Sequence, residues 1–257
     1  MGTTILHAVE SGNPEGAPVV LLSSIGTTHA AWDNQLEALR DFRVIALDHL
    51  GHGQSPLATT AVDSVAQLAD NVLATLDSLG VDRFAVVGLS LGGAIAQYLA
   101  ATCPRVSRAA ICATATFLGG KDRWVQRCGI ARDEGMEALA DGMVDNWLTP
   151  GFRAAEPDVV EHLRRMILGI NKEGFAQNGD ALATWDFAGR LSEITCPVLT
   201  IAGAEDPSTG PEQLAEIAAG VSGEVRSVVI SPGSHQVALE NPRMFNEALV
   251  TFLAPIS

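Results

Sequence analysis

The sequence predicts an α/β protein whose mostly parallel, twisted sheet carries helices on both faces and a helical insertion before its last strands. Short apolar runs alternate with helix-like segments, which is typical of βαβ units and therefore of a parallel sheet. One apolar run ends in a Gly-x-Ser-x-Gly turn that leads directly into an Ala-rich segment. The stretch from Phe117 to Trp185 breaks the alternation, because it lacks Val- and Ile-rich runs and shows helical patterns instead. A chain of 257 residues is long enough to form one such domain with a large core.

Each expected strand is a short apolar run bounded by turn-forming residues. The strands are expected at Thr4–Val9, Val19–Ser23, Arg43–Leu47, Phe84–Gly88, Arg108–Cys112, Val198–Ala202 and Val225–Ile230. Asn13-Pro-Glu-Gly16 predicts a hairpin turn between the first two strands, since Pro and Gly suit a tight turn. Helices are expected at Ala31–Leu39, Asp63–Leu79, Gly92–Thr102, Pro211–Ala219 and Pro242–Leu253. Asp63 and Pro242 suit helix starts, and Gly80 suits the end of the second helix.

The insertion carries amphipathic patterns that Gly and Pro separate. We expect short helices at Lys121–Arg132, Glu134–Trp147, Asp158–Ile170 and Lys172–Thr184. This divides the chain into a core of residues 1–116 and 186–257 and an insertion of residues 117–185. The insertion holds Trp124, Trp147 and Trp185, as a lid over an active site would. The alternative is that these tryptophans pack a small core of the insertion's own.

The composition excludes several classes of partner. A formal net charge of −14 argues against binding to nucleic acid and to anionic membrane surfaces. Hydrophobic residues make up 47% of the chain and charged residues 18%, which fits a folded enzyme rather than a disordered chain. Residues 1–10 lack the basic and apolar regions of a signal peptide, and no apolar run is long enough to span a membrane. The cysteines are scattered, so we expect reduced thiols in a cytoplasmic protein, with no metal ligands and no cofactor motif.

Gly88-Leu-Ser-Leu-Gly92 is the most informative motif in the chain. It follows the apolar run Phe84–Val87 and precedes the helix-favouring segment Gly93–Ala101. A strand, this turn and a helix together form a nucleophile elbow, in which a strained turn presents the serine hydroxyl at the open end of a sheet. We therefore predict that Ser90 is a catalytic nucleophile. The alternative is a Gly- and Ser-rich turn without chemistry.

An acid and a base for Ser90 are expected later in the chain, because a serine hydroxyl is a weak nucleophile until an oriented base removes its proton. After a nucleophile elbow the acid comes first and the histidine second, each on a loop that follows a strand. The loop after the strand at 198–202 offers two candidates for the acid, Asp206 and Glu205. Asp206 is favoured, because the ring of Pro207 restricts the backbone of the residue before it to an extended form. The loop after the next strand offers His235. The other histidines are expected in loops or at the surface: His7, His29, His49, His52 and His162. Of these, His29 and His49 are expected nearest the pocket.

Two backbone N–H groups are needed to form an oxyanion hole for the tetrahedral intermediate. One should come from Leu91, which follows the nucleophile, and the other from the loop Ser23–Thr28, where Ile25 is the candidate.

The chain resembles the α/β-hydrolase superfamily over its whole length. Besides the serine turn, Asp48-His-Leu-Gly-His-Gly-Gln-Ser55 resembles that superfamily's Asp-x-x-Gly-x-Gly-x-Ser loop. Within the superfamily the chain is similar to bacterial 3-oxoadipate enol-lactonases (β-ketoadipate enol-lactone hydrolases). The similar stretches are Ser24–Thr28, Trp32-Asp33, Phe42–Val44, Gly88–Gly93, Ala113–Ala115, Trp124–Arg127, Gly135-Met136, Trp147–Pro150, Asp206–Pro211 and Ser234–Pro242. The chain departs from the pattern at Ser23-Ser24, where His-Gly is usual, at Ser231–Ser234 and at Gly210.

The resemblance implies a cofactor-free serine hydrolase of aromatic catabolism. Its expected substrate is a five-membered enol-lactone with a carboxymethyl group, which is opened to 3-oxoadipate through an acyl-enzyme on Ser90. The substrate carboxylate needs a cation within an acidic protein, and we expect Arg127, with Arg123 as the second candidate, to bind it. Trp124 and Trp147 are expected to form the apolar wall of the pocket. The alternative for each arginine is an exposed position on a helix.

Other functions stay open at this point. A generic carboxylesterase, a C–C bond hydrolase or a perhydrolase would use the same three residues. A ligand-binding member of the fold without hydrolytic activity is the alternative from a different class, although such relatives usually lose a member of the triad. Epoxide hydrolases and haloalkane dehalogenases are disfavoured, because those families carry Asp at the position of Ser90. The sequence does not define the oligomeric state.

Overall fold

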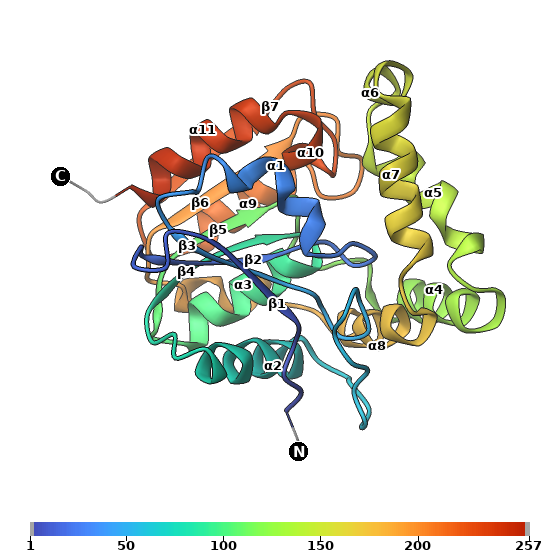
Figure 1. Ribbon diagram of the computed structural model, residues 1–257, viewed down its shortest axis with the longest axis horizontal. Helices are drawn as coiled ribbons and strands as arrows, with labels where there is room; N and C mark the ends of the chain where they lie inside the picture. The colour runs from blue at the N-terminus through green and yellow to red at the C-terminus, as the bar shows by residue number, and fades with distance from the viewer. Residues whose placement is uncertain (1–2, 255–257) are drawn as a thin grey trace.

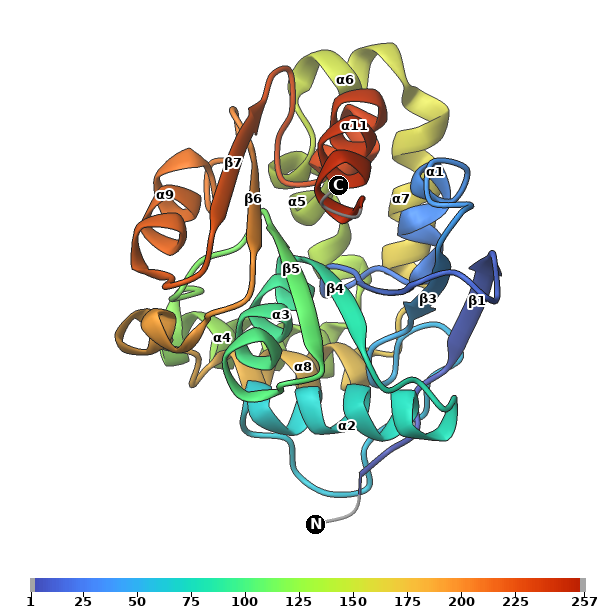
Figure 2. The same ribbon diagram turned by 90° about the vertical axis from the view of Figure 1, so that its left-hand side faces the viewer.

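The computed structural model describes residues 3–254, so Met1 and Gly2 of the segment considered above for a signal peptide lie outside the described residues. Within that range a single sheet has the strand order β1-β3-β2-β4-β5-β6-β7, in which β1 is antiparallel to its neighbour and the other pairs are parallel (Figures 1 and 2). The strands are β1 (Ala8–Gly12), β2 (Pro18–Leu22), β3 (Arg43–Leu47), β4 (Phe84–Leu89), β5 (Val106–Cys112), β6 (Val198–Gly203) and β7 (Val225–Ile230). The predicted mostly parallel sheet is confirmed.

The helices fall into two groups, one around the sheet and one in the insertion. The first group is η1 (His29–Trp32), α1 (Asp33–Leu36), α2 (Val65–Ser78), α3 (Leu91–Thr102), η2 (Ala188–Glu193), α9 (Pro211–Gly220), α10 (Val237–Glu240) and α11 (Pro242–Leu253). The second group, here called the insertion helices, is α4 (Gly120–Glu134), α5 (Glu137–Trp147), α6 (Pro150–Ala155), α7 (Pro157–Leu168) and α8 (Lys172–Leu182). Helix α6 was not predicted, because it is short and depends on a local cap. The Thr149 hydroxyl accepts a hydrogen bond from Phe152 N–H, and Pro150 follows at the first turn.

The helix predicted at Ala31–Leu39 differs from the structure. The chain first forms the 3-10 helix η1, whose cap Thr28 accepts a hydrogen bond from Ala30 N–H, and then a single α turn that ends at Leu36. The predicted helix thus starts too late and ends too late, because the capping residue lies before the apolar pattern from which the prediction was made.

Two layers of helices bury the two faces of the sheet. Successive side chains of a strand point to opposite faces, so in β2 Val20 and Leu22 join one apolar core while Val19 and Leu21 join the other. Helices α2, α3 and α9 cover the first face, and α1 and α11 cover the second (Figure 2). Each fully buried side chain of this kind contributes roughly 1.5–3 kcal/mol to folding. The predicted helices on both faces are confirmed.

The predicted hairpin between the first two strands is wrong. The turn itself is present, since Gly16 N–H donates to Asn13 O at 2.9 Å, but β1 pairs with β3 and places Ala8 opposite Leu47. β2 is buried along nearly its whole length and lies between two neighbours, whereas β1 is partly exposed and lies at an edge. A turn motif fixes the local path of the chain, but burial decides which strands become neighbours.

The first strand also begins later than predicted. Thr4 N–H donates to Asn71 Oδ1 at 2.8 Å, and Leu6 N–H donates to Thr75 Oγ1 at 2.9 Å. Both acceptors lie on α2, so side chains of a helix, and not a neighbouring strand, satisfy the N–H groups of Thr4 and Leu6.

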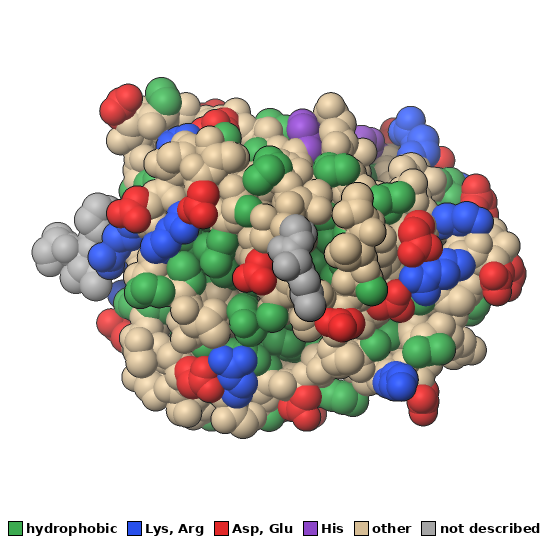
Figure 3. Space-filling view, turned by 90° about the horizontal axis from the view of Figure 1, so that it is seen from below, with side chains coloured by type: hydrophobic (Ala, Val, Ile, Leu, Met, Phe, Trp, Pro, Cys, Tyr) green, Lys and Arg blue, Asp and Glu red, His purple; other side chains and the backbone are tan. Residues whose placement is uncertain are grey.

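The insertion helices lie together beside the sheet (Figure 1). None of the helices within residues 3–254 is long and apolar enough to cross a membrane. On the face shown in Figure 3, acidic side chains are interspersed with Lys and Arg, so the excess negative charge does not form one continuous patch there. Several charged side chains of the protein are paired, for example Arg164 with Asp141 at 2.6 Å.

Candidate active site

Ser90 lies in the sharp turn between β4 and α3. Its φ of 59° and ψ of −112° lie in a region that costs a non-glycine residue about 1–3 kcal/mol. A Cβ atom on Gly88 would lie 2.0 Å from Gly92 O, and one on Gly92 would lie 2.0 Å from Leu22 O. Strand and helix therefore approach too closely for any side chain at these two positions. The Thr114 hydroxyl donates to Ser90 O at 2.9 Å and helps to hold the turn.

Asp206 and His235 meet on the loops after β6 and β7. His235 Nδ1 lies 2.8 Å from Asp206 Oδ2, and both side chains are buried. Glu205, the competing acid, is exposed and accepts a hydrogen bond from Gly233 N–H at 3.4 Å. Ser90 and His235 line the same cavity. The structure thus brings together the three residues that the sequence suggested as nucleophile, acid and base.

The environment of Asp206 keeps its carboxylate ionised. Oδ1 accepts hydrogen bonds from the N–H groups of Ser208 (2.9 Å) and Thr209 (3.1 Å), and Oδ2 accepts one from Thr209 Oγ1 (2.7 Å). Burial raises the pKa of Asp206, but the interaction with His235 and these donors outweighs burial and holds the pKa well below its usual range. An ionised Asp206 favours the His235 tautomer with its proton on Nδ1, which leaves Nε2 able to accept a proton.

Thr209 is a member of this network that the sequence analysis did not single out. Its Oγ1 lies 2.7 Å from Asp206 Oδ2 and 2.9 Å from His235 Nδ1, so one hydroxyl contacts both groups. The available signal was its position three residues after the acid, where Asp side chains often bond to the following residues.

We expect Thr209→Val to lower kcat about tenfold with little change in KM, because the His235 ring loses one of its two anchors on the Nδ1 side. Steady-state hydrolysis of a p-nitrophenyl ester measures both constants. Thr209→Ser retains the hydroxyl and should restore most of kcat. Equal kcat values for wild type and Thr209→Val would show that Asp206 alone orients the ring.

Ile25 and Leu91 are the two residues predicted to supply the N–H donors of an oxyanion hole. Leu91 is the first residue of α3, so its N–H has no partner within the helix. Ile25 lines the cavity together with Ser90, and its N–H has no hydrogen-bond partner in the described part of the chain. The amino end of α3 adds a favourable field for negative charge.

His49 and His52 lie in the loop that follows β3, which agrees with the loop alternative of the prediction, but both side chains are buried and neither is at the surface. His49 Nε2 lies 2.7 Å from Ser23 O, and His52 Nε2 accepts a hydrogen bond from Gly26 N–H at 2.9 Å. The loop that follows β3 therefore packs against the loop that carries Ile25. Burial is the reason that both rings are neutral: it lowers the pKa of His49 and lowers that of His52 to about 3, with the neighbouring His49 adding to the effect.

A dependence of stability on pH follows from His52. Its ring takes up a proton near pH 6.5 when unfolded but only near pH 3 when folded, so the unfolded chain binds more protons between these values. The free energy of unfolding should therefore fall as the pH drops below 6.5, by about 1 kcal/mol per pH unit from this group. Urea unfolding of wild type and His52→Gln at about pH 7 and about pH 5 measures it. The variant should show the smaller decrease; an equal decrease would contradict the assignment.

A cavity of about 80 Å³ brings loops of the sheet and helices of the insertion together. The sheet loops contribute Ile25, Ser90, Ser208, Thr209 and His235, and the insertion helices contribute Arg123, Trp124, Arg127 and Trp147 among others. The Trp147 ring stacks on His235 with 5.8 Å between ring centroids and 28° between planes. Trp185, by contrast, stacks on Phe187 at 4.9 Å and is absent from the lining, so it has a packing role.

Comparison with known proteins identifies the family. The chain matches the family described as the alpha/beta hydrolase fold over residues 17–242. It belongs to that family. The chain is 31% identical to 3-oxoadipate enol-lactonase 2 of Acinetobacter baylyi, over 95% of this chain and 91% of that protein. The crystal structure of the enol-lactonase from Burkholderia xenovorans LB400 matches with a TM-score of 0.93 and 34% identity, covering 96% of each chain.

Another relative of this α/β hydrolase has a different named activity. The putative carbamate hydrolase RutD of Agrobacterium fabrum is 30% identical over 93% of this chain and 94% of that protein. The names of the relatives therefore support a hydrolase, while the choice of substrate has to be argued from the cavity.

Arg127 is the feature of the cavity that distinguishes between substrates. Its guanidinium lies over the rings of Trp124 and Phe175, 5.0 and 5.8 Å from their centroids, and forms no ion pair within residues 3–254. Burial, together with the charge of Arg123, lowers the pKa of Arg127 to about 10, so the side chain is still cationic at neutral pH. Arg132 on the same helix instead forms ion pairs with Glu173 at 3.0 Å and with Asp180 at 2.6 Å.

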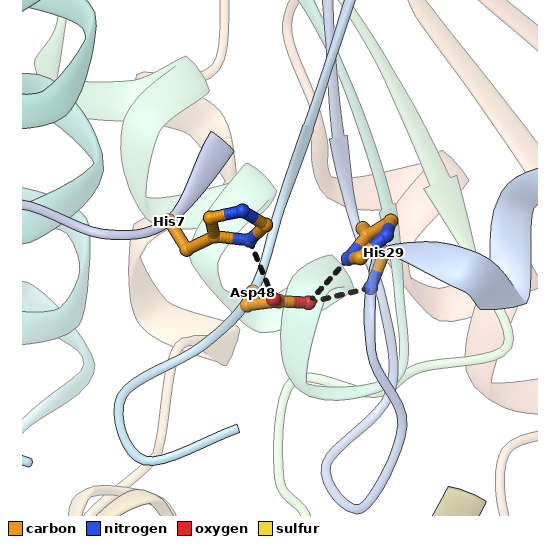
Figure 4. A group of neighbouring side chains, drawn as sticks. All are labelled: His7, His29 and Asp48. Carbon is orange, nitrogen blue, oxygen red and sulfur yellow. Dashed lines mark hydrogen bonds and ion pairs between the residues drawn. The ribbon is translucent and has the colours of Figure 1, made fainter. Parts of the chain in front are cut away.

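Asp48 of this hydrolase lies between two histidines (Figure 4). His7 Nδ1 is 2.8 Å from Oδ2 and His29 Nδ1 is 3.0 Å from Oδ1, a set of ligand types that zinc also uses. The two oxygens already accept further hydrogen bonds from the N–H groups of Gln54 (3.1 Å) and His29 (2.7 Å). The hydrogen bonds of Asp48 therefore join the loop after β3 to the N-terminal segment and to the start of η1. Sequence spacing did not reveal it, because the histidines lie 41 and 19 positions from Asp48.

Proposed function

We propose that this α/β hydrolase opens a small lactone that carries a carboxylate, with 3-oxoadipate enol-lactone as the substrate. The observation that carries the proposal is Arg127, a partly buried cation in the lining shared with Ser90 that has no ion-pair partner among residues 3–254. A desolvated guanidinium is costly unless an anion compensates it, and a carboxylate can accept two of its hydrogen bonds at once. The similarity to the two enol-lactonases described above, at 31% and 34% identity, supports the same choice.

In the proposed reaction Ser90, His235 and Asp206 act as nucleophile, base and orienting acid. His235 Nε2 takes the Ser90 hydroxyl proton as Oγ attacks the lactone carbonyl, and the N–H groups of Ile25 and Leu91 stabilise the oxyanion. The bond between carbonyl carbon and ring oxygen then breaks. The enolate that leaves takes the proton from His235 and becomes a ketone, while the acyl group stays on Ser90.

Water completes the proposed cycle. His235 removes a proton from a water molecule, the hydroxide attacks the acyl carbon, and the Ser90 hydroxyl is restored with release of the open-chain acid. No cofactor takes part in these steps.

We assign residues 117–185 as a lid and residues 1–116 and 186–257 as the catalytic core. Support comes from the cavity, because the insertion helices supply Arg127, Trp124 and Trp147 while the sheet loops supply the reacting groups. A wider groove of about 470 Å³ shares Arg127 and Trp147 with the cavity and reaches Pro207. We propose this groove as the entrance for substrate.

Hydrolysis of three substrates by the wild-type protein tests the proposal. The substrates are 3-oxoadipate enol-lactone, its neutral methyl ester and p-nitrophenyl acetate. The anionic lactone should have a kcat/KM about 100-fold above that of its methyl ester, since only the former can pair with Arg127. Fast cleavage of p-nitrophenyl acetate with negligible lactone opening would instead support a generic carboxylesterase.

A further inference from the structure

The loop that carries Ile25 is held by hydrogen bonds on either side of that residue. Before it, Ser23 O accepts from His49 Nε2 at 2.7 Å and from Gly92 N–H at 3.1 Å. After it, Gly26 N–H donates to His52 Nε2 at 2.9 Å. Because Ile25 lies between these fixed points, the direction of its own N–H depends on both of them.

Both nitrogens of the His52 ring are engaged, and their roles are defined by their partners. Gly26 supplies a backbone N–H, so Nε2 must be the unprotonated acceptor. Nδ1 then carries the proton and donates to Leu50 O at 2.8 Å. The ring thus bridges two backbone segments, and only its neutral form can do so.

We propose that His52 is a positioning residue for the oxyanion hole: its neutral ring fixes Gly26 and thereby aims the Ile25 N–H at the developing oxyanion. The proposal rests on the function proposed above. It assigns a reaction-specific task to a residue that does not line the cavity and does not touch the substrate.

The opposite side of the loop shows why this contact matters. Gly26 has φ +85°, and a Cβ atom there would lie 2.6 Å from Met143 Cε and 3.4 Å from Trp147. The insertion therefore packs closely against Gly26, and His52 accepts a hydrogen bond from the N–H group of the same residue. Without an acceptor at His52, Gly26 N–H would be a buried donor without a partner, and the loop would be expected to turn to satisfy it.

A pair of substitutions separates positioning from packing. His52→Met fills the space but leaves only a weak sulfur acceptor in place of Nε2, whereas His52→Gln retains an amide oxygen as a strong acceptor for Gly26 N–H. We expect His52→Met to lower kcat for p-nitrophenyl acetate about 10- to 30-fold with KM changed less than about threefold, and His52→Gln to recover most of kcat. His162→Met, at an exposed position of α7, is the matched control and should match wild type.

Inhibitor binding provides the readout that a purely structural role would not alter. A trifluoromethyl ketone forms a tetrahedral adduct with Ser90, and its affinity should fall in His52→Met by about the same factor as kcat/KM. Binding of the open-chain product should be unchanged. Unchanged kcat in His52→Met, or equal losses in the Met and Gln variants, would overturn the proposal.

The same experiment distinguishes this inference from the substrate proposal. If the wild-type protein cleaves p-nitrophenyl acetate but does not open the lactone, the substrate proposal fails while the comparison of His52 variants still decides the positioning role. If the wild-type protein neither cleaves the ester nor reacts with the ketone, Ser90 is not an activated nucleophile and both proposals fail.

Discussion

Ser90→Ala is expected to abolish hydrolysis of both the enol-lactone and p-nitrophenyl acetate, with kcat lower by about 10⁴-fold or more. Without Oγ no acyl-enzyme can form, and the remaining groups can only hold the substrate beside water. The measurement is steady-state hydrolysis of the two substrates by wild type and variant. KM or the binding constant for the product should change little, since the arginine and the aromatic wall are intact.

The variant is expected to fold normally. Alanine at φ 59° experiences the same backbone strain as serine. The hydrogen bond that the Thr114 hydroxyl donates to the backbone carbonyl oxygen of residue 90 is retained. Ser78→Ala, on the distant helix α2, is a matched control that should keep full activity. If Ser90→Ala retained more than about 1% of wild-type kcat with an unchanged melting temperature, a nucleophile other than Ser90 would have to be sought.

The parts of the fold that the sequence predicted are those with local causes. β3, β7 and α11 have the predicted bounds, because an apolar run or a proline start defines each of them. The position of β1 was not predictable in this way, because its neighbour β3 is chosen by the burial of β2 and not by the turn that joins β1 to β2.

The same distinction applies to the site. The position of Ser90 in a sharp turn could be predicted because a strand, two glycines and a helix surround it in sequence. The approach of Asp206 and His235 could be predicted because each follows a neighbouring strand. The contacts of His52 with Gly26 and of Thr209 with His235 could not be predicted, since each joins residues 26 positions apart. A histidine in a Gly-rich loop gives no sign of burial until the facing loop is placed against it.

Two arginines of helix α4 differ in how their charges are balanced. Arg132 is held by two carboxylates, so its charge is balanced within the protein. Arg127 has aromatic rings on its faces and forms no ion pair in residues 3–254. Contacts with aromatic rings offset only part of the cost of burying a guanidinium, so the carboxylate of the proposed substrate would compensate the rest.

Arg127→Met is therefore expected to lower kcat/KM for the enol-lactone about 10²- to 10³-fold and to leave kcat/KM for p-nitrophenyl acetate nearly unchanged. Methionine keeps the contact with Trp124 and Phe175, so the free energy of unfolding should stay within about 1 kcal/mol of wild type. Steady-state kinetics with both substrates and urea unfolding measure the two effects. Arg127→Lys retains the charge but not the planar fork and should recover part of the loss.

Two further arginines show whether the effect belongs to the cavity or to the charge of the insertion. Arg164→Met removes an exposed cation that pairs with Asp141, and it should change neither substrate's kinetics. Arg123→Met removes an exposed cation at the rim of the cavity and should cost less than about tenfold with the lactone. Equal losses of kcat/KM for the lactone at all three positions would indicate long-range attraction of the anion. If Arg127→Met instead lowered kcat/KM equally for the lactone and for p-nitrophenyl acetate, Arg127 would shape the pocket without binding a carboxylate.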